Sequence, residues 1–95
     1  MRKLTKFVKE ELQHKLAICE DEIDGLDGDW YVTPKAALEM VLATGTVAAL
    51  QSSPAAIAEL ENTVEILNHN IAAGYETEGN QLKSAVARLK RAMYA

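Results

Sequence analysis

The feature that most constrains the fold is the stretch from residue 34 to residue 51, which is apolar nearly all round when it is drawn as a helix. Thr33 followed by Pro34 predicts its start, because the hydroxyl can cap the first amides and the missing proline N–H does no harm there. The apolar residues leave only a thin polar stripe, which consists of Lys35, Glu39 and Thr46. Such a helix must be covered on most sides, either by other helices of its own chain or by another subunit.

Two further stretches show the apolar spacing of amphipathic helices. In the first, apolar residues recur in steps of three and four; they are Leu4, Phe7, Val8, Leu12, Leu16, Cys19 and Ile23. Gly25 and Gly28 predict its end. In the second, Ser53 and Pro54 repeat the cap-then-proline signal, and apolar residues follow from residue 57 to residue 71 with the spacing of a coiled-coil seam. The tight turn before Pro54 predicts an antiparallel helical hairpin.

The segment AAGYETEGN, residues 72–80, decides the number of helices. Gly74 and Gly79 inside one helix would together cost about 2 kcal/mol relative to alanine. We therefore predict a break, with a fourth helix from about residue 77 or 80 to Tyr94, and one long helix over residues 54–94 as the alternative. The sequence thus predicts a single all-α domain over residues 1–95. This domain is a small antiparallel bundle of four helices, or of three with a long C-terminal helix, built around the hairpin.

Composition narrows the classes of function. The net charge of −4 argues against general nucleic-acid binding, which normally needs an excess of Lys and Arg on one face. The longest apolar stretch, residues 36–50, is too short to cross a membrane. A single cysteine and the lack of a secretion-signal pattern predict a cytoplasmic protein. No catalytic or cofactor motif is recognisable, so we expect neither an enzyme nor a bound cofactor.

The stretch EDEIDGLDGDWYVTP, residues 20–34, is the first candidate site. Six of its first ten residues are acidic, and the only tryptophan follows them. No register of the stretch fits a calcium-binding loop, which leaves a loose divalent-cation site, a solvated turn or a contact surface. In a contact surface the carboxylates would attract a basic partner and the aromatic side chains would anchor it; the residues are Asp21, Asp24, Asp27, Asp29, Trp30 and Tyr31. Alternatively, Trp30 packs over the open end of the bundle.

The two ends of the chain form the second candidate site. Residues 1–9 carry +4 and residues 83–91 carry +4, whereas residues 20–29 carry −6 and residues 59–78 carry −5. In an up-down bundle the two basic ends meet at one pole, and the acidic stretch meets the GYETEG loop at the other. An anionic ligand such as a nucleotide could then bind to Lys83, Arg88, Lys90 and Arg91, together with Arg2, Lys3, Lys6 and Lys9. Tyr75 offers a stacking face; otherwise it is an exposed aromatic at a helix break.

Histidine and cysteine give weaker signals. His14 and His69 lack the spacing of a paired metal site, although Glu65 precedes His69 by one helical turn and could join it in a weak metal site. A surface position is the simpler interpretation for both. Cys19 falls on the apolar stripe of the first helix, where it is expected to be a small buried hydrophobe rather than a nucleophile.

Two functional hypotheses follow. The first is a self-associating protein-interaction module, acting as a phage-encoded or accessory inhibitor or adaptor that binds a protein partner through the acidic stretch and Trp30. The second is a small-ligand binder or sponge, which holds an anionic nucleotide at the basic pole or at a subunit interface. In size and helical hairpin the chain is similar to small phage proteins that sequester cyclic nucleotide signals, although it shares no motif with them.

Overall fold

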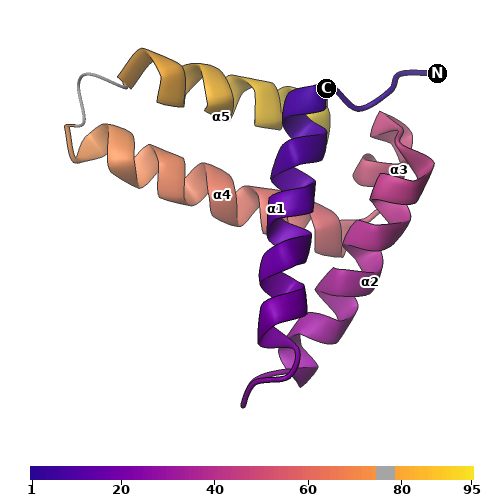
Figure 1. Ribbon diagram of the computed structural model, residues 1–95. Coiled ribbons are helices and arrows are strands. Elements are labelled where there is room, and N and C mark those ends of the chain that lie inside the picture. The colour runs from indigo at the N-terminus through magenta and orange to yellow at the C-terminus, as the bar shows by residue number, and fades with distance from the viewer. Residues whose placement is uncertain (75–78) are drawn as a thin grey trace.

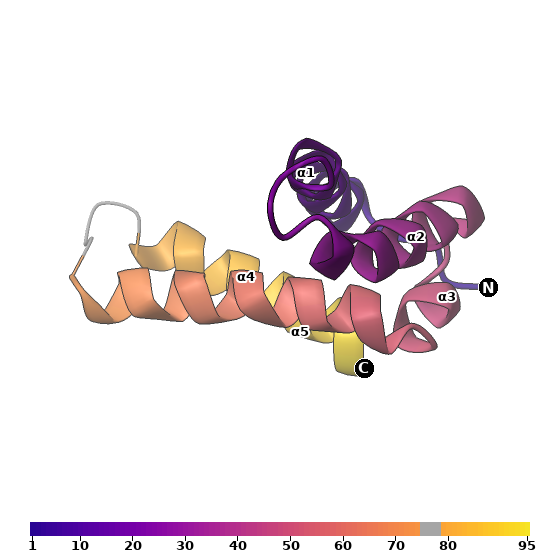
Figure 2. The same ribbon diagram turned by 90° about the horizontal axis from the view of Figure 1, so that it is seen from below.

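The computed structural model describes residues 1–74 and 79–95, and helices make up most of them. Along the chain these helices are α1 (Lys6–Glu22), α2 (Asp29–Thr44), α3 (Val47–Gln51), α4 (Pro54–Ala72) and α5 (Gly79–Tyr94). α1 and α2 run in opposite directions as one pair, and α4 and α5 form a second pair that lies across the first (Figure 1; Figure 2). The predicted all-α class and the small helical bundle are confirmed.

Side-chain caps explain where three of the helices begin. Thr5 Oγ1 accepts a hydrogen bond from the Val8 amide at 3.3 Å, which caps α1. In the same way Thr46 caps α3, and Ser53 Oγ accepts from the Ala56 amide at 3.4 Å to cap α4. The predicted start of α4 at Pro54 is confirmed, because both the cap and the proline act locally.

The single helix predicted over residues 34–51 is wrong at both ends. α2 begins at Asp29, so Thr33 does not cap it and Pro34 lies inside it, where the backbone loses one hydrogen bond. At the other end Gly45 adopts the left-handed conformation, with φ +72, and its amide donates to the Val41 carbonyl at 2.8 Å. This left-handed turn closes α2, and residues 47–51 form the separate helix α3.

The pairing of helices also differs from the predicted hairpin. α2 and α4 cross instead of lying along one another, because α3 and its two short connections separate them (Figure 1). The predicted break in residues 72–80 is confirmed: α4 ends at Ala72 and α5 begins at Gly79. One continuous helix over residues 54–94 is therefore wrong. Gly74, with φ +84, turns the chain away from the axis of α4.

The core lies where the two pairs of helices cross. Every helix and the segment before α1 contribute buried apolar side chains; they are Leu4, Val8, Leu12, Cys19, Leu38, Val41, Val47, Leu50, Ala56, Leu60, Val64, Val86, Leu89, Ala92 and Met93. The two crossed pairs give a flat molecule of 38 × 37 × 18 Å. A flat shape leaves broad outer faces on the helices.

Backbone hydrogen bonds hold the N-terminal segment against the middle of the chain. The Leu4 amide donates to the Gly45 carbonyl, and the Val47 amide donates to the Arg2 carbonyl, each at 3.0 Å. On the other side, Arg2 Nη1 donates to the Ala95 carbonyl at 3.2 Å. The basic start of the chain is thereby fixed beside α3 and the C-terminal end of α5.

Candidate functional site

The acidic stretch occupies one end of the α1–α2 pair. Asp21 lies in the last turn of α1, Asp24 and Asp27 lie in the connection, and Asp29 is the first residue of α2. All the carboxylate side chains of residues 20–29, called here the acidic turn, are exposed. In the part of the chain that the structure describes, the salt bridges join other residues, so none of these carboxylates has a cationic partner.

The backbone of the acidic turn is tightly wound. The Gly25 amide donates to the Glu22 carbonyl at 2.9 Å, and the Gly28 amide donates to the Gly25 carbonyl at 3.2 Å. A Cβ atom at residue 28 would overlap the carbonyl of Ile23, so this position requires glycine. The turn therefore has a defined conformation, which sets the positions of the side chains that follow it.

Trp30 and Tyr31 point to different environments. Tyr31 is partly buried against the core, whereas Trp30 is 80% exposed, so the interpretation that Trp30 packs over the end of the bundle is wrong. Leu26, in the middle of the acidic turn, is fully exposed as well. Sequence reasoning did not single out Leu26, although an isolated leucine between Gly25 and Asp27 was the available signal. Two large apolar side chains thus lie in water among the carboxylates.

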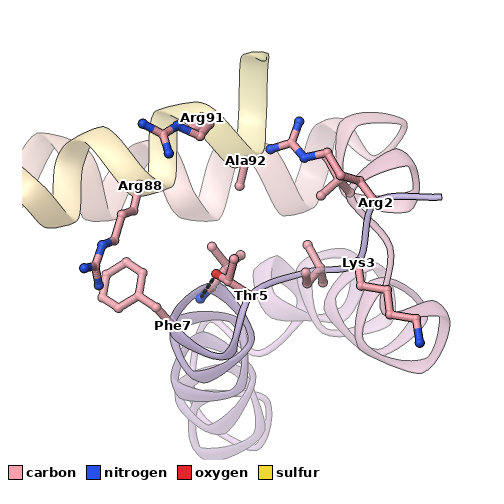
Figure 3. A pocket seen from close by; sticks show the side chains of 10 residues that line it. Arg2, Lys3, Thr5, Phe7, Arg88, Arg91 and Ala92 are labelled. Atoms are coloured by element: carbon pink, nitrogen blue, oxygen red, sulfur yellow. Dashed lines mark hydrogen bonds between the residues drawn. The ribbon is translucent and has the colours of Figure 1, made fainter.

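The basic ends of the chain come together around a cavity of about 240 Å³ (Figure 3). Cationic side chains reach it from the N-terminal segment and from α5; they are Arg2, Lys3, Arg88 and Arg91. The rest of the lining is apolar or hydroxylic, from Leu4, Thr5, Phe7, Val8, Val47 and Ala92. Among the residues that the structure describes, no acidic one lines this space, called here the basic cavity.

The side chains around the basic cavity differ in orientation. Arg88 reaches from α5 over the Phe7 ring, with its guanidinium carbon 5.6 Å from the ring centroid (Figure 3). This distance is typical of a cation–π contact, which holds the guanidinium in place. Figure 3 also shows Arg91 along the rim formed by α5, and Lys3 pointing away from α5. Arg2, Arg88 and Arg91 therefore lie on the α5 side of the cavity, whereas Lys3 leads away from it.

The other predicted ligand residues lie elsewhere. Lys90 lines a separate groove between α4 and α5, where Tyr94 Oη donates to Glu61 Oε1 at 2.6 Å and this bond raises the pKa of Tyr94. Lys83 is exposed near the start of α5, and Lys6 and Lys9 are exposed on α1, with Lys6 Nζ 3.9 Å from Glu10 Oε1.

Tyr75 and the centre of the GYETEG loop lie outside the described residues. The loop's flanks do not approach the acidic turn, because the end of α4 and the α1–α2 connection lie well apart in both views (Figure 1; Figure 2).

Histidine and cysteine occupy simple environments. His14 and His69 are both exposed, and His69 shares a shallow depression with Glu65 and Lys15. Over residues 1–74 and 79–95, no three His, Cys, Asp or Glu side chains are grouped as metal ligands would be. Cys19 is buried, as predicted, and burial followed by the nearby Glu59 raises the pKa of its thiol. A neutral, enclosed thiol is a poor nucleophile.

The outer face of α2 is a further apolar surface. Leu38 and Val41 are buried, but Val32 and Met40 are 51% and 69% exposed, and the alanines between and beyond them, Ala36 and Ala43, are exposed too. One chain thus covers only one side of a helix that was predicted to be covered on most sides. Self-association through this face stays a prediction. Among the described helices, none has the length and hydrophobicity that crossing a bilayer requires.

Comparison with known proteins gives no match. No protein-family model fits the chain, no curated protein matches its sequence, and no solved structure matches its fold. Function must therefore be inferred from the acidic turn and the basic cavity themselves.

Proposed function

We propose that the protein is a docking module that binds a basic surface of a protein partner through the acidic turn and Trp30. The observation that carries this proposal is the 80% exposure of Trp30 beside the fully exposed Leu26. A tryptophan has roughly 150–250 Å² of surface to bury. At about 25 cal/mol per Å², covering its exposed part would contribute about 3–5 kcal/mol to binding. Tryptophan is also among the residues that most often dominate interface energies.

The carboxylates determine what kind of partner fits. A cluster of unpaired negative charges speeds the approach of a positively charged surface and repels an acidic one. The partner surface should therefore be rich in Lys and Arg, with an apolar recess for Trp30 and Leu26. Since Tyr31 is partly buried against the core, it supports the backbone beside Trp30 and contributes less contact area of its own.

Covering a basic surface on a partner would make the protein an inhibitor or an adaptor, a role that phage-encoded and accessory proteins commonly fill. We place this interaction in the cytoplasm, where the single cysteine would stay reduced. In this proposal the chain performs no chemistry, and its effect depends on which surface of the partner it occupies.

The test compares three forms of the protein as bait for quantitative affinity capture. Trp30→Ala removes the anchor, Asp24→Asn with Asp27→Asn removes two charges, and Tyr94→Phe is the control, because Tyr94 is an exposed aromatic at the end of α5. A true partner should stay on the control, be lost from Trp30→Ala, and bind the charge variant more weakly. Its affinity for the unaltered protein should also fall as salt rises.

A partner retained equally by Trp30→Ala and by the control would contradict the proposal, because its binding would then use another surface. Circular dichroism of each variant checks the fold. Both Trp30 and the two aspartates are exposed, so these substitutions should leave helicity unchanged.

A further inference from the structure

We infer that the basic cavity binds a small phosphorylated organic molecule, with the phosphate held by Arg2, Arg88 and Arg91. The three arginines come from opposite ends of the sequence, and the fold brings them to one cavity (Figure 3). This site is separate from the acidic turn and does not depend on the docking function proposed above.

The distribution of charge is the first argument. The chain carries a net charge of −4, yet four of its ten cationic side chains line one cavity, and no acidic residue of the described ranges 1–74 and 79–95 lines it. Over residues 1–74 and 79–95, the salt bridges are Lys6 with Glu10 and Lys35 with Glu39, so no carboxylate side chain pairs with a lining cation, and Arg2 donates to the Ala95 carbonyl. Like charges gathered around one cavity repel one another. An anion in the cavity would turn these repulsions into attractions.

The chemistry of the cations is the second argument. Arginine presents several N–H donors in a planar fork that matches the oxygens of a phosphate, and it keeps its charge at any physiological pH. Arg88 is already oriented by its contact with Phe7, so it loses less side-chain freedom when it binds. Arg2 is oriented by its bond to the Ala95 carbonyl. Both guanidinium groups are thus partly positioned before a ligand arrives.

The size and walls of the cavity limit the ligand. About 240 Å³ is slightly below the usual range for drug-sized ligands. This volume suits a mononucleotide or a smaller phosphate ester better than a polymer. Phe7, Val8, Val47 and Ala92 provide an apolar wall on which the organic part can lie. The arginines bind the phosphate, and the apolar wall adds affinity for a ligand with an organic part over inorganic phosphate.

Two matched double variants test this inference. Arg88→Gln with Arg91→Gln removes two charges from the cavity, and Lys83→Gln with Lys90→Gln removes two charges from the same helix outside it. Binding of adenosine monophosphate and of inorganic phosphate is measured by titration of amide NMR signals. For the unaltered protein we expect saturable shifts of Thr5, Phe7, Val8, Val47 and Ala92 on addition of the nucleotide.

The cavity variant should bind adenosine monophosphate at least about tenfold more weakly, which corresponds to about 1.4 kcal/mol, whereas the lysine variant should change the affinity by less than about threefold. Equal losses in both variants would overturn the inference, since they would indicate general charge attraction. Shifts that do not saturate, or that are spread over lysines far from the cavity, would overturn it too. Equal affinity for inorganic phosphate would overturn the assignment of an organic ligand.

Discussion

The two faces of α2 allow a quantitative test of the fold. Leu38 has no exposed surface, whereas Met40, two residues further along the same helix, is 69% exposed. Leu38→Ala would remove atoms from the core and leave a cavity, which costs about 2–5 kcal/mol. Met40→Ala removes a side chain that lies mostly in water, and surface substitutions usually change stability by less than about 0.5 kcal/mol. The expected difference between the two variants is therefore at least about 1.5 kcal/mol.

Urea unfolding followed by circular dichroism measures this difference. A domain of 95 residues has an unfolding free energy of about 5–14 kcal/mol, so Leu38→Ala should remain folded but become clearly less stable. With an m-value of about 1–3 kcal/mol per molar urea, its midpoint should fall by about 0.7 M or more. The urea midpoint of Met40→Ala should move by only a few tenths of the shift expected for Leu38→Ala. Equal shifts in the two variants would refute the assignment of α2's buried face.

The dependence of the urea midpoint on protein concentration is a second measurement, which compares Met40→Ala with the unaltered protein. If a second copy covers the outer face of α2, the midpoint of the unaltered protein rises with concentration. Met40→Ala should then reduce that rise and shift the subunit number in native mass spectrometry towards the monomer. A midpoint independent of concentration, with unchanged subunit number in Met40→Ala, would refute self-association through this face.

Two smaller predictions concern the α4 cap and the buried thiol. Ser53→Ala should lower stability by about 1 kcal/mol, because it removes the cap of α4; Ser52→Ala is the control, and equal thermal midpoints of the two variants would contradict the assignment. The raised pKa of buried Cys19 means that the thiol ionises more easily in the unfolded chain. The stability that the buried, neutral thiol contributes is therefore complete below the pKa of the thiol in the unfolded chain, about 8.5, and is lost as pH rises above this value. Between pH 7 and pH 9.5, the urea midpoint of Cys19→Ala should fall less steeply with pH than that of the unaltered protein. Equal pH slopes in the two proteins would count against this effect.

The cap-then-proline signal predicted the start of α4 correctly and the start of α2 wrongly. Ser53 and Pro54 begin α4 as predicted, but Thr33 and Pro34 lie inside α2. The helix starts earlier because Tyr31 lies two turns before Leu38 on the same face, and its packing against the core offsets the hydrogen bond lost at the proline. Packing of this kind depends on other helices, so a local sequence pattern cannot predict it.

The two sites differ in how far the sequence could predict them. The meeting of the basic ends was predicted from the topology of an up-down bundle. It arises instead from long-range backbone pairing of the N-terminal segment, in which Lys3 lies opposite Thr46. This pairing also explains why Gly45 ends α2 rather than lying within a longer helix. The exposure of Trp30 could not be predicted while residues 30 and 31 were assigned to a loop, since the start of α2 at Asp29 is what turns Tyr31 toward the core and leaves Trp30 exposed.

The positions of the two sites decide whether they can influence one another. The basic cavity lies at the N-terminal end of α1 and the acidic turn at its C-terminal end. A helix of 17 residues is about 25 Å long, which is roughly three times the screening length of about 8 Å at physiological ionic strength. An anion bound in the cavity therefore changes the potential at the acidic turn very little. Electrostatics alone leaves the two sites independent, and binding at one should not alter affinity at the other. Measured coupling would have to be reciprocal, and it would mean that α1 and α2 shift relative to one another when either site is occupied.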